Sequence, residues 1–126
     1  MTNAADSATF NHEDYISTVT VFGEVKKSII SKDFKGGKVQ MLFGKTVLDF
    51  NNADIKGIAV LDISEAFGET IIIVPDNWRV QTDQVLALAT FEDKRPAGSQ
   101  NFDPNKVLII TGFSMFAAIK VVKFRY

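Results

Sequence analysis

Histidine is the first residue type to consider for catalysis, and this chain contains a single one, His12. A Ser-His-Asp triad needs an imidazole that packing holds in place, and a zinc site needs three or four His, Cys or carboxylate ligands close together. His12 lies in a polar N-terminal stretch, and cysteine is absent from the chain. The sequence therefore predicts neither a nucleophilic triad nor a zinc site.

Oxygen ligands for calcium gather between Asp49 and Asp54, with Asn51 and Asn52 between them. An EF-hand loop that begins at Asp49 would need Gly at its sixth position and Glu at its twelfth. The chain has Asp54 and Val60 there, so the pattern predicts turns and no metal site.

Carboxylates are the remaining groups for hydrolytic chemistry. Glycosidases hold two of them on either side of the bond that breaks. The chain offers several, and no spacing singles out a pair: Asp62, Glu65, Glu69, Glu92 and Asp93. The glycine-rich stretch FKGGK at 34–38 also lacks the spacing of a phosphate-binding loop. We expect no catalytic residue, no cofactor and no enzymatic activity.

A further set of residues could contact a protein partner: Trp78, Arg79, Asp93, Lys94 and Arg95. A half-exposed Trp beside an Arg is a common anchor of protein interfaces. The alternative is that Trp78 packs on the core with its N–H satisfied at the edge, and that the charged run forms an ion pair within the chain. We favour packing for Trp78 and keep all five as the candidate contact surface.

The composition is that of a globular domain without a strong electrostatic preference. Over 126 residues, 14 basic and 15 acidic side chains leave a net charge of -1, which predicts no binding to nucleic acid. Apolar runs are far shorter than the roughly 20 residues that span a bilayer, and the start does not resemble a signal peptide. We expect a cytoplasmic protein without a transmembrane segment, or the soluble part of a longer membrane protein.

The elements that would position these residues follow a β pattern. Residues 1–14 are polar and lack periodicity, which predicts a flexible tail. In the remainder, residues 15–126, short runs rich in Val, Ile, Thr and Phe are bounded by Gly, Pro, Asn or Asp, and no window holds a helical period. We expect a single β-repeat domain there.

A short phrase recurs along this domain, as VFGEV at 21–25, LFGKT at 42–46 and AFGET at 66–70. With two weaker copies, five anchor positions follow one another at intervals of 21, 24, 21 and 28 residues: Phe22, Phe43, Phe67, Leu88 and Phe116. This period predicts an all-β fold, a short parallel β-solenoid of about five coils that share one core. The alternative is an antiparallel β-sandwich.

In such a stack the anchors would lie above one another. We expect a ladder near the axis, with Phe43 in a central coil and Phe116 in a terminal one. The small residue after each anchor fits a bend between strands. The polar tail and the charges of Lys120, Lys123 and Arg125 would discourage stacking of one molecule on another, so we expect a monomer or weak homodimer.

The third and fourth copies resemble the C-terminal domain of LiaF-like proteins, which are bacterial regulators of the cell-envelope stress response. The family phrase is Phe-Gly-Gly, a β segment, Val-Pro, Trp, a basic residue and Val, and later Asp-Lys-Arg. The matching residues are Phe67, Gly68, Val74, Pro75, Trp78, Arg79, Val80, Asp93, Lys94 and Arg95. At the second Gly the chain has Glu24, Lys45 and Glu69 instead, so we expect those positions to face the surface.

The resemblance implies a non-catalytic protein-interaction or scaffold domain that modulates a two-component sensor system. Its partner would be a sensor kinase or another membrane-associated regulator, through which the chain would reach the membrane. The alternative is a protein that binds carbohydrate or another envelope polymer, or a weak hydrolase that uses acidic residues on one face of the solenoid. A cleft lined with aromatics and carboxylates would favour that alternative, and an apolar patch would favour the partner.

Overall fold

The regular structure of this chain consists of β-strands that pair only in parallel. The computed structural model describes residues 9–11, 14–95 and 103–123, and no helix occurs in these ranges. Its strands are β1 (Thr9–Asn11), β2 (Tyr15–Ile29), β3 (Gly36–Asp49), β4 (Gly57–Ala66), β5 (Gly68–Ile73), β6 (Arg79–Ala87), β7 (Thr90–Asp93), β8 (Lys106–Met115) and β9 (Ala118–Val122). Every pairing between them is parallel. The predicted β-solenoid is confirmed, and the antiparallel sandwich is excluded.

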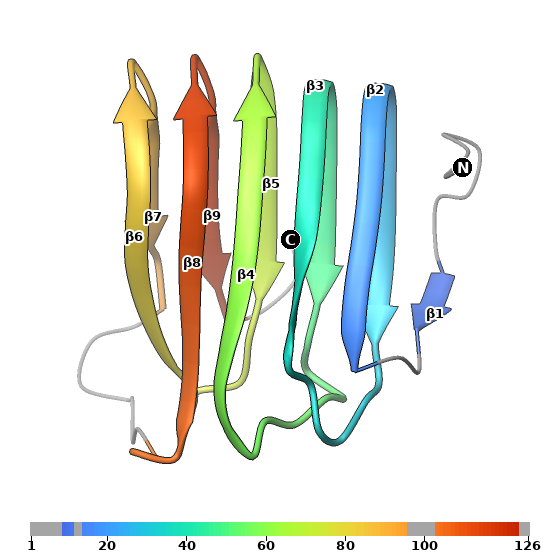
Figure 1. Ribbon diagram of the computed structural model, residues 1–126, viewed down its shortest axis with the longest axis vertical. Coiled ribbons are helices and arrows are strands. Elements are labelled where there is room, and N and C mark those ends of the chain that lie inside the picture. The colour runs from blue at the N-terminus through green and yellow to red at the C-terminus, as the bar shows by residue number, and fades with distance from the viewer. Residues whose placement is uncertain (1–8, 12–13, 96–102, 124–126) are drawn as a thin grey trace.

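Each coil of the solenoid is a strand segment, a sharp bend and a second strand segment (Figure 1). β2 and β3 run through the bend unbroken, whereas the pairs β4–β5, β6–β7 and β8–β9 are interrupted at it. We number the coils by sequence, so coil 1 is β2, coil 2 is β3, and coils 3, 4 and 5 are those three pairs. The first segments stack into one wall and the second segments into another, and the two walls meet at the bends. The bends fall at the repeated phrase, as the period predicts.

The coils are not stacked in the order of the sequence. Coil 5 lies between coil 3 and coil 4, because β8 pairs with both β4 and β6, and β9 pairs with both β5 and β7. Among the described residues, β6 and β7 therefore form the edge of the stack opposite to coil 1. The expectation that Phe116 belongs to a terminal coil is wrong. Lys120 also lies in this inner coil, so its charge does not mark the end of the stack.

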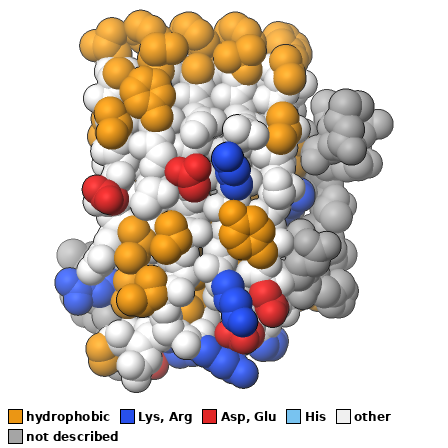
Figure 2. Space-filling view, viewed as in Figure 1, with side chains coloured by type: hydrophobic (Ala, Val, Ile, Leu, Met, Phe, Trp, Pro, Cys, Tyr) orange, Lys and Arg blue, Asp and Glu red, His pale blue; other side chains and the backbone are white. Residues whose placement is uncertain are grey.

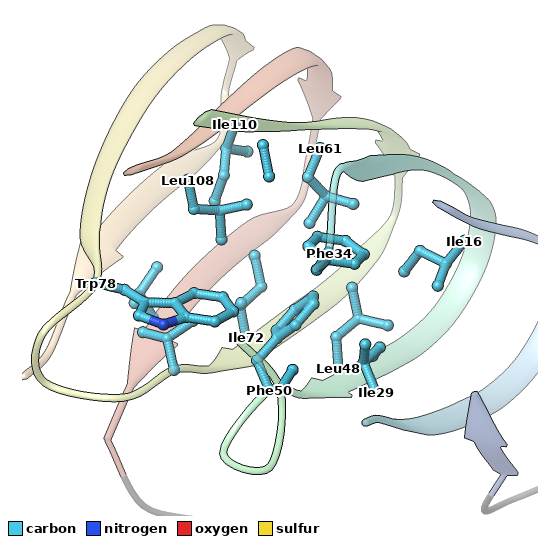
Figure 3. Close-up of a cluster of buried hydrophobic side chains, with 14 of the residues drawn as sticks. Ile16, Ile29, Phe34, Leu48, Phe50, Leu61, Ile72, Trp78, Leu108 and Ile110 are labelled. Carbon is cyan, nitrogen blue, oxygen red and sulfur yellow. The ribbon is translucent and has the colours of Figure 1, made fainter. Parts of the chain in front are cut away.

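The core fills the wedge between the two walls. Strand residues alternate between inward and outward positions, and the inward ones are apolar and fully buried. Examples are Ile16, Leu61 and Ile110 on the first wall, and Leu48 and Ile72 on the second (Figure 3). The two walls are thereby held together by aliphatic packing from coil 1 to coil 5, and coil 4 adds only the partly buried Val80 and Phe91.

Three loops close the base of the wedge with aromatic side chains. Phe34, Phe50 and Trp78 are buried in a row, with ring centroids 4.9 Å apart for the first pair and 5.5 Å for the second (Figure 3). Backbone hydrogen bonds tie two of these loops together, since the N–H of Phe34 donates to the carbonyl of Asp54, and the N–H of Asp54 donates to that of Ser31. The buried aromatic ladder of this fold is made by these loop residues.

The ladder expected near the axis is wrong in its position. The anchor residues do stack, but they lie at the outer edge, with exposed fractions from 41% at Phe43 to 79% at Leu88. The residue at the tip of a sharp bend has no opposite wall within reach, so its side chain points away from the wedge. The anchors therefore contribute little to the core.

Among the described residues, one end of the stack is partly covered and the other is open. β1, within the stretch expected to be a flexible tail, pairs with Lys27, Ser28 and Ile29 of coil 1. At the other end, β6 and β7 are open, and the amide of Gln84 in coil 4 reaches inward, where it donates to the backbone carbonyls of Thr111 in coil 5 and Ile63 in coil 3. The rest of the tail lies outside the described residues, apart from Asp14. In the part of the chain that the structure describes, no helix is long and apolar enough to cross a membrane.

Candidate functional site

The bends form an apolar edge along one side of the molecule, which we call the aromatic ridge. In stacking order it consists of Phe22, Phe43, Phe67, Phe116 and Leu88. From Phe22 to Phe116, neighbouring ring centroids are 6.3, 5.2 and 5.4 Å apart. Figure 2 shows hydrophobic side chains along the whole upper edge of the molecule. Every coil contributes one large apolar side chain to the same exposed line.

The two flanks of the aromatic ridge differ in character. On the first wall, the residue before each ridge position is apolar and none is buried: Val21, Leu42, Ala66, Met115 and Ala87. On the second wall, Glu24, Lys45 and Glu69 lie two residues after the ridge positions, at the surface. The carboxylate of Glu69 forms ion pairs with Lys45 Nζ at 3.9 Å and with Lys120 Nζ at 2.9 Å. The ridge therefore has an apolar flank on the first wall, and a flank on the second wall that is charged in coils 1 to 3 and uncharged in coils 4 and 5, at Thr90 and Ala118.

Coils 1 and 2 make the bend with glycine. Gly23 and Gly44 have φ angles of 126° and 145°, which residues with a side chain rarely adopt. A Cβ on Gly44 would lie 1.8 Å from the carbonyl oxygen of Gly23 in the coil beside it. The repeated Gly after Phe thus allows the backbones of neighbouring coils to approach each other at the bend.

The other three coils bend at the ridge residue itself. Phe67, Leu88 and Phe116 have φ angles of 56°, 52° and 50°, in the left-handed region. This conformation costs a residue with a side chain about 1–2 kcal/mol. Backbone preference disfavours large apolar residues at these positions, and the core does not require them, although the rings of Phe67 and Phe116 stack with a centroid distance of 5.4 Å. Such strain occurs preferentially at binding and active sites.

The left-handed conformation predicts an unusual order of stability among substitutions at Phe67. Asn tolerates this conformation and Val does not, because its branched Cβ clashes with the backbone. We therefore expect Phe67→Val to be less stable than Phe67→Asn by about 1–2 kcal/mol, although Val is the more hydrophobic residue. Urea unfolding of both variants measures the difference. A Phe67→Val protein as stable as Phe67→Asn would contradict the left-handed backbone conformation of Phe67.

Beneath the aromatic ridge, a chain of hydrogen bonds runs from Gln84 through Ser114 and Glu65 to Thr70. The amide nitrogen of Gln84 donates to two backbone carbonyls, so its Oε1 is the acceptor for Ser114 Oγ at 2.6 Å. Ser114 has one proton, which this bond uses, so its contact with Glu65 Oε2 at 3.4 Å calls for a proton on Glu65. Thr70 donates to Glu65 Oε1 at 3.0 Å. The geometry thus fits a neutral carboxyl group.

The surroundings of Glu65 agree with that protonation state. The residue is 3% exposed. Burial raises the pKa of Glu65 to about 7 and outweighs the hydrogen bond from Thr70, which lowers it. Because the carboxyl group is closed off from solvent, it has no direct access to a substrate. Its role is within the interior.

The structure brings three of the five candidate contact residues together. Trp78 is 1% exposed and Arg95 is 4% exposed, so both are part of the interior. The Arg95 guanidinium donates to the carbonyl oxygen of Trp78 at 2.6 Å and pairs with Asp93 at 2.8 Å. Arg79 and Lys94 have exposed side chains outside this cluster. A partner contact at Arg79, Asp93 and Lys94 stays a prediction.

The carboxylates considered for hydrolysis do not gather into a site. Asp62 accepts a hydrogen bond from Thr111 at 3.1 Å, Glu69 holds the two ion pairs described above, and Glu92 is exposed. In the described ranges, no three His, Cys, Asp or Glu side chains are placed to hold a metal ion. His12 lies outside the described residues.

The oxygen-rich stretch at 49–54 uses its carboxylates in turns. The N–H of Asn51 donates to Asp49 Oδ1 at 3.0 Å, and the N–H of Ile55 donates to Asp54 Oδ1 at 2.9 Å. Asp54 also pairs with Lys106. The turns predicted for this stretch are present.

The aromatic ridge was misplaced by the sequence analysis, although a signal for its exposure exists. Each ridge residue follows another apolar residue, as Phe22 follows Val21 and Phe43 follows Leu42. Successive strand residues point to opposite faces, so two adjacent apolar residues cannot both point inward.

No protein-family model, curated protein or solved structure matches this chain.

Proposed function

We propose that this chain is a non-catalytic protein-interaction domain whose contact surface is the aromatic ridge. One observation carries the proposal, namely a continuous line of exposed large apolar residues, three of them in a backbone conformation that disfavours them. Exposed apolar patches of this extent mark interaction sites in soluble proteins. The coils hold the ridge residues in fixed register, as a rigid scaffold for a contact should.

The resemblance to LiaF-like proteins adds a class of partner to this proposal. In that role the ridge would contact a sensor kinase or another membrane-associated regulator and modulate a two-component system. Arg79 and Asp93 are the first and last strand residues of coil 4, and Lys94 follows directly, so all three lie at the opposite end of this coil from Leu88. A partner seated on the Leu88 end of the ridge would reach them by extending along coil 4.

The alternative, binding of carbohydrate or hydrolysis on one face, has less support. Such a site would combine aromatics and carboxylates in a cleft. A shallow hollow of about 290 Å³ beside the ridge is lined by Val19, Thr20, Val21, Gln40, Met41, Leu42 and Ser64, which include no carboxylate. The aromatic side chains of the ridge stand on a convex edge instead.

Photo-crosslinking in the cells that make the protein tests the proposal. A photoreactive amino acid at Phe43 on the ridge is compared with one at Ile58, which is also exposed but lies outside the ridge. We expect covalent protein adducts at Phe43, identified by mass spectrometry, and few at Ile58. Equal yields at the two positions would overturn the ridge as the contact surface.

A further inference from the structure

We propose that the aromatic ridge pairs with the ridge of a second copy of this chain, in antiparallel orientation about Phe67. This inference rests on the proposed function and names the occupant of the same surface. The pairing follows from the size of the ridge, the order of its residues and the difference between its flanks.

The ridge is large enough for a stable dimer. At roughly 200 Å² for a whole Phe side chain and somewhat less for Leu and Val, the exposed parts of the ridge together with Val21 and Leu42 amount to on the order of 700 Å² per copy. The largest apolar patch on a typical monomer is roughly 300–600 Å². Two ridges in contact would bury at most about 1,400 Å², in the lower part of the roughly 1,200–2,000 Å² of stable, specific interfaces.

The order of residues along the ridge suits a twofold axis at its middle rung. Phe67 stands at the centre of the stacking order, with Phe43 and Phe116 on either side of it. Antiparallel pairing would set Phe67 against its copy, Phe43 against Phe116, and Phe22 against Leu88. The two end residues are the most exposed, at 78% and 79%, and in this arrangement the larger Phe22 would pack on the smaller Leu88.

The flanks select this orientation over a parallel one. Antiparallel pairing corresponds to a twofold axis that lies in the plane of contact and is perpendicular to the ridge. This axis places the first wall of one copy on the same side of the interface as the first wall of the other, so the two apolar flanks meet. An axis along the ridge would instead place the apolar flank of one copy against Glu24, Lys45 and Glu69 of the other. Burying such charges beside apolar groups is costly.

Sedimentation over a concentration series, from micromolar to near-millimolar, tests the pairing with the purified chain of residues 1–126. We expect a reversible monomer–dimer equilibrium. Phe67→Asn, which suits the left-handed backbone, should raise the dimer dissociation constant at least about tenfold while the fold is retained, because a central aromatic is lost from both copies. Ile58→Asn, at an exposed position outside the ridge, is the matched control and should leave the constant unchanged.

Single cysteines test the orientation, since the chain has none of its own. Phe22→Cys and Leu88→Cys proteins, oxidised separately, should give little disulfide-linked dimer, whereas their mixture should give the mixed dimer. Dimers from each variant alone, and none that are mixed, would overturn the antiparallel arrangement. A wild-type protein that stays monomeric throughout the series would overturn the pairing. Crosslinks from Phe43 to a different protein in cells would then still support the proposed function.

Discussion

Trp78→Ala is expected to lower the free energy of unfolding by about 3–5 kcal/mol, the usual effect of truncating a fully buried large aromatic residue. Trp78 is 1% exposed and packs against Phe50 at the base of the wedge. Its carbonyl oxygen accepts a bond from the buried Arg95 guanidinium. A cavity at this position would loosen the loop on which Arg95 depends. Urea unfolding measures the difference.

Phe43→Ala is the matched comparison for this prediction. Phe43 is also aromatic and belongs to a central coil, but it stands on the aromatic ridge and is 41% exposed. Truncating it removes part of a ring stack and leaves no closed cavity, so we expect a loss below about 2 kcal/mol. A Phe43→Ala protein as destabilised as Trp78→Ala would place the core at the bends and contradict the fold.

Glu65→Gln is expected to stabilise the protein above pH 7. The folded-state pKa of Glu65, about 7, lies above its ordinary value of 4.5. Between these values the folded state binds more protons than the unfolded state, so stability falls as the pH rises from 4.5 to 7. A shift of this size corresponds to about 3 kcal/mol lost above pH 7 and none below pH 4.5. Gln has the shape of the neutral carboxyl group and can donate a hydrogen bond to Ser114, so the variant should keep the stability that the parent protein loses above pH 7.

Unfolding free energies at several pH values between 4 and 8 test this prediction. The difference in the free energy of unfolding between Glu65→Gln and the parent protein should be near zero at the acid end of this range and largest at the alkaline end. Glu92→Gln, at an exposed position, serves as the control for removal of one negative charge. A Glu65→Gln variant that gains nothing between the acid and alkaline ends would mean that Glu65 is ionised in the fold.

The coil architecture could be predicted from the sequence because it depends on a local signal. The repeat of Phe-Gly at intervals of 21 and 24 residues fixes where each strand bends, and the bends at Gly23 and Gly44 occur there. Runs of Val, Ile and Thr then allow strands on both sides of each bend. Each of these features can be read from a few neighbouring residues.

The stacking order and the exposure of the anchors could not be predicted in this way. Coils 3, 4 and 5 carry similar patterns, so nothing local indicates that β8 pairs with β4 and separates it from β6. The anchor residues are as hydrophobic as Phe34 and Phe50, and only the geometry of the bend puts one set outside and the other inside. The sequence left two possibilities for Asp93 and Arg95, a contact with a partner or an ion pair within the chain. The structure shows the ion pair, because Arg95 is buried.

The position of coil 5 has a consequence for synthesis on the ribosome. Coils 1, 2 and 3 can pair with one another as the nascent chain emerges, but coil 4 appears before the coil that separates it from coil 3 in the finished stack. If β6 paired with the free edge of β4 in the meantime, it would occupy the place of β8 and would have to be displaced. At roughly 5–20 residues per second, this interval lasts on the order of seconds. In that case, correct assembly depends on displacement of β6 by β8, the first strand of the coil that is translated last.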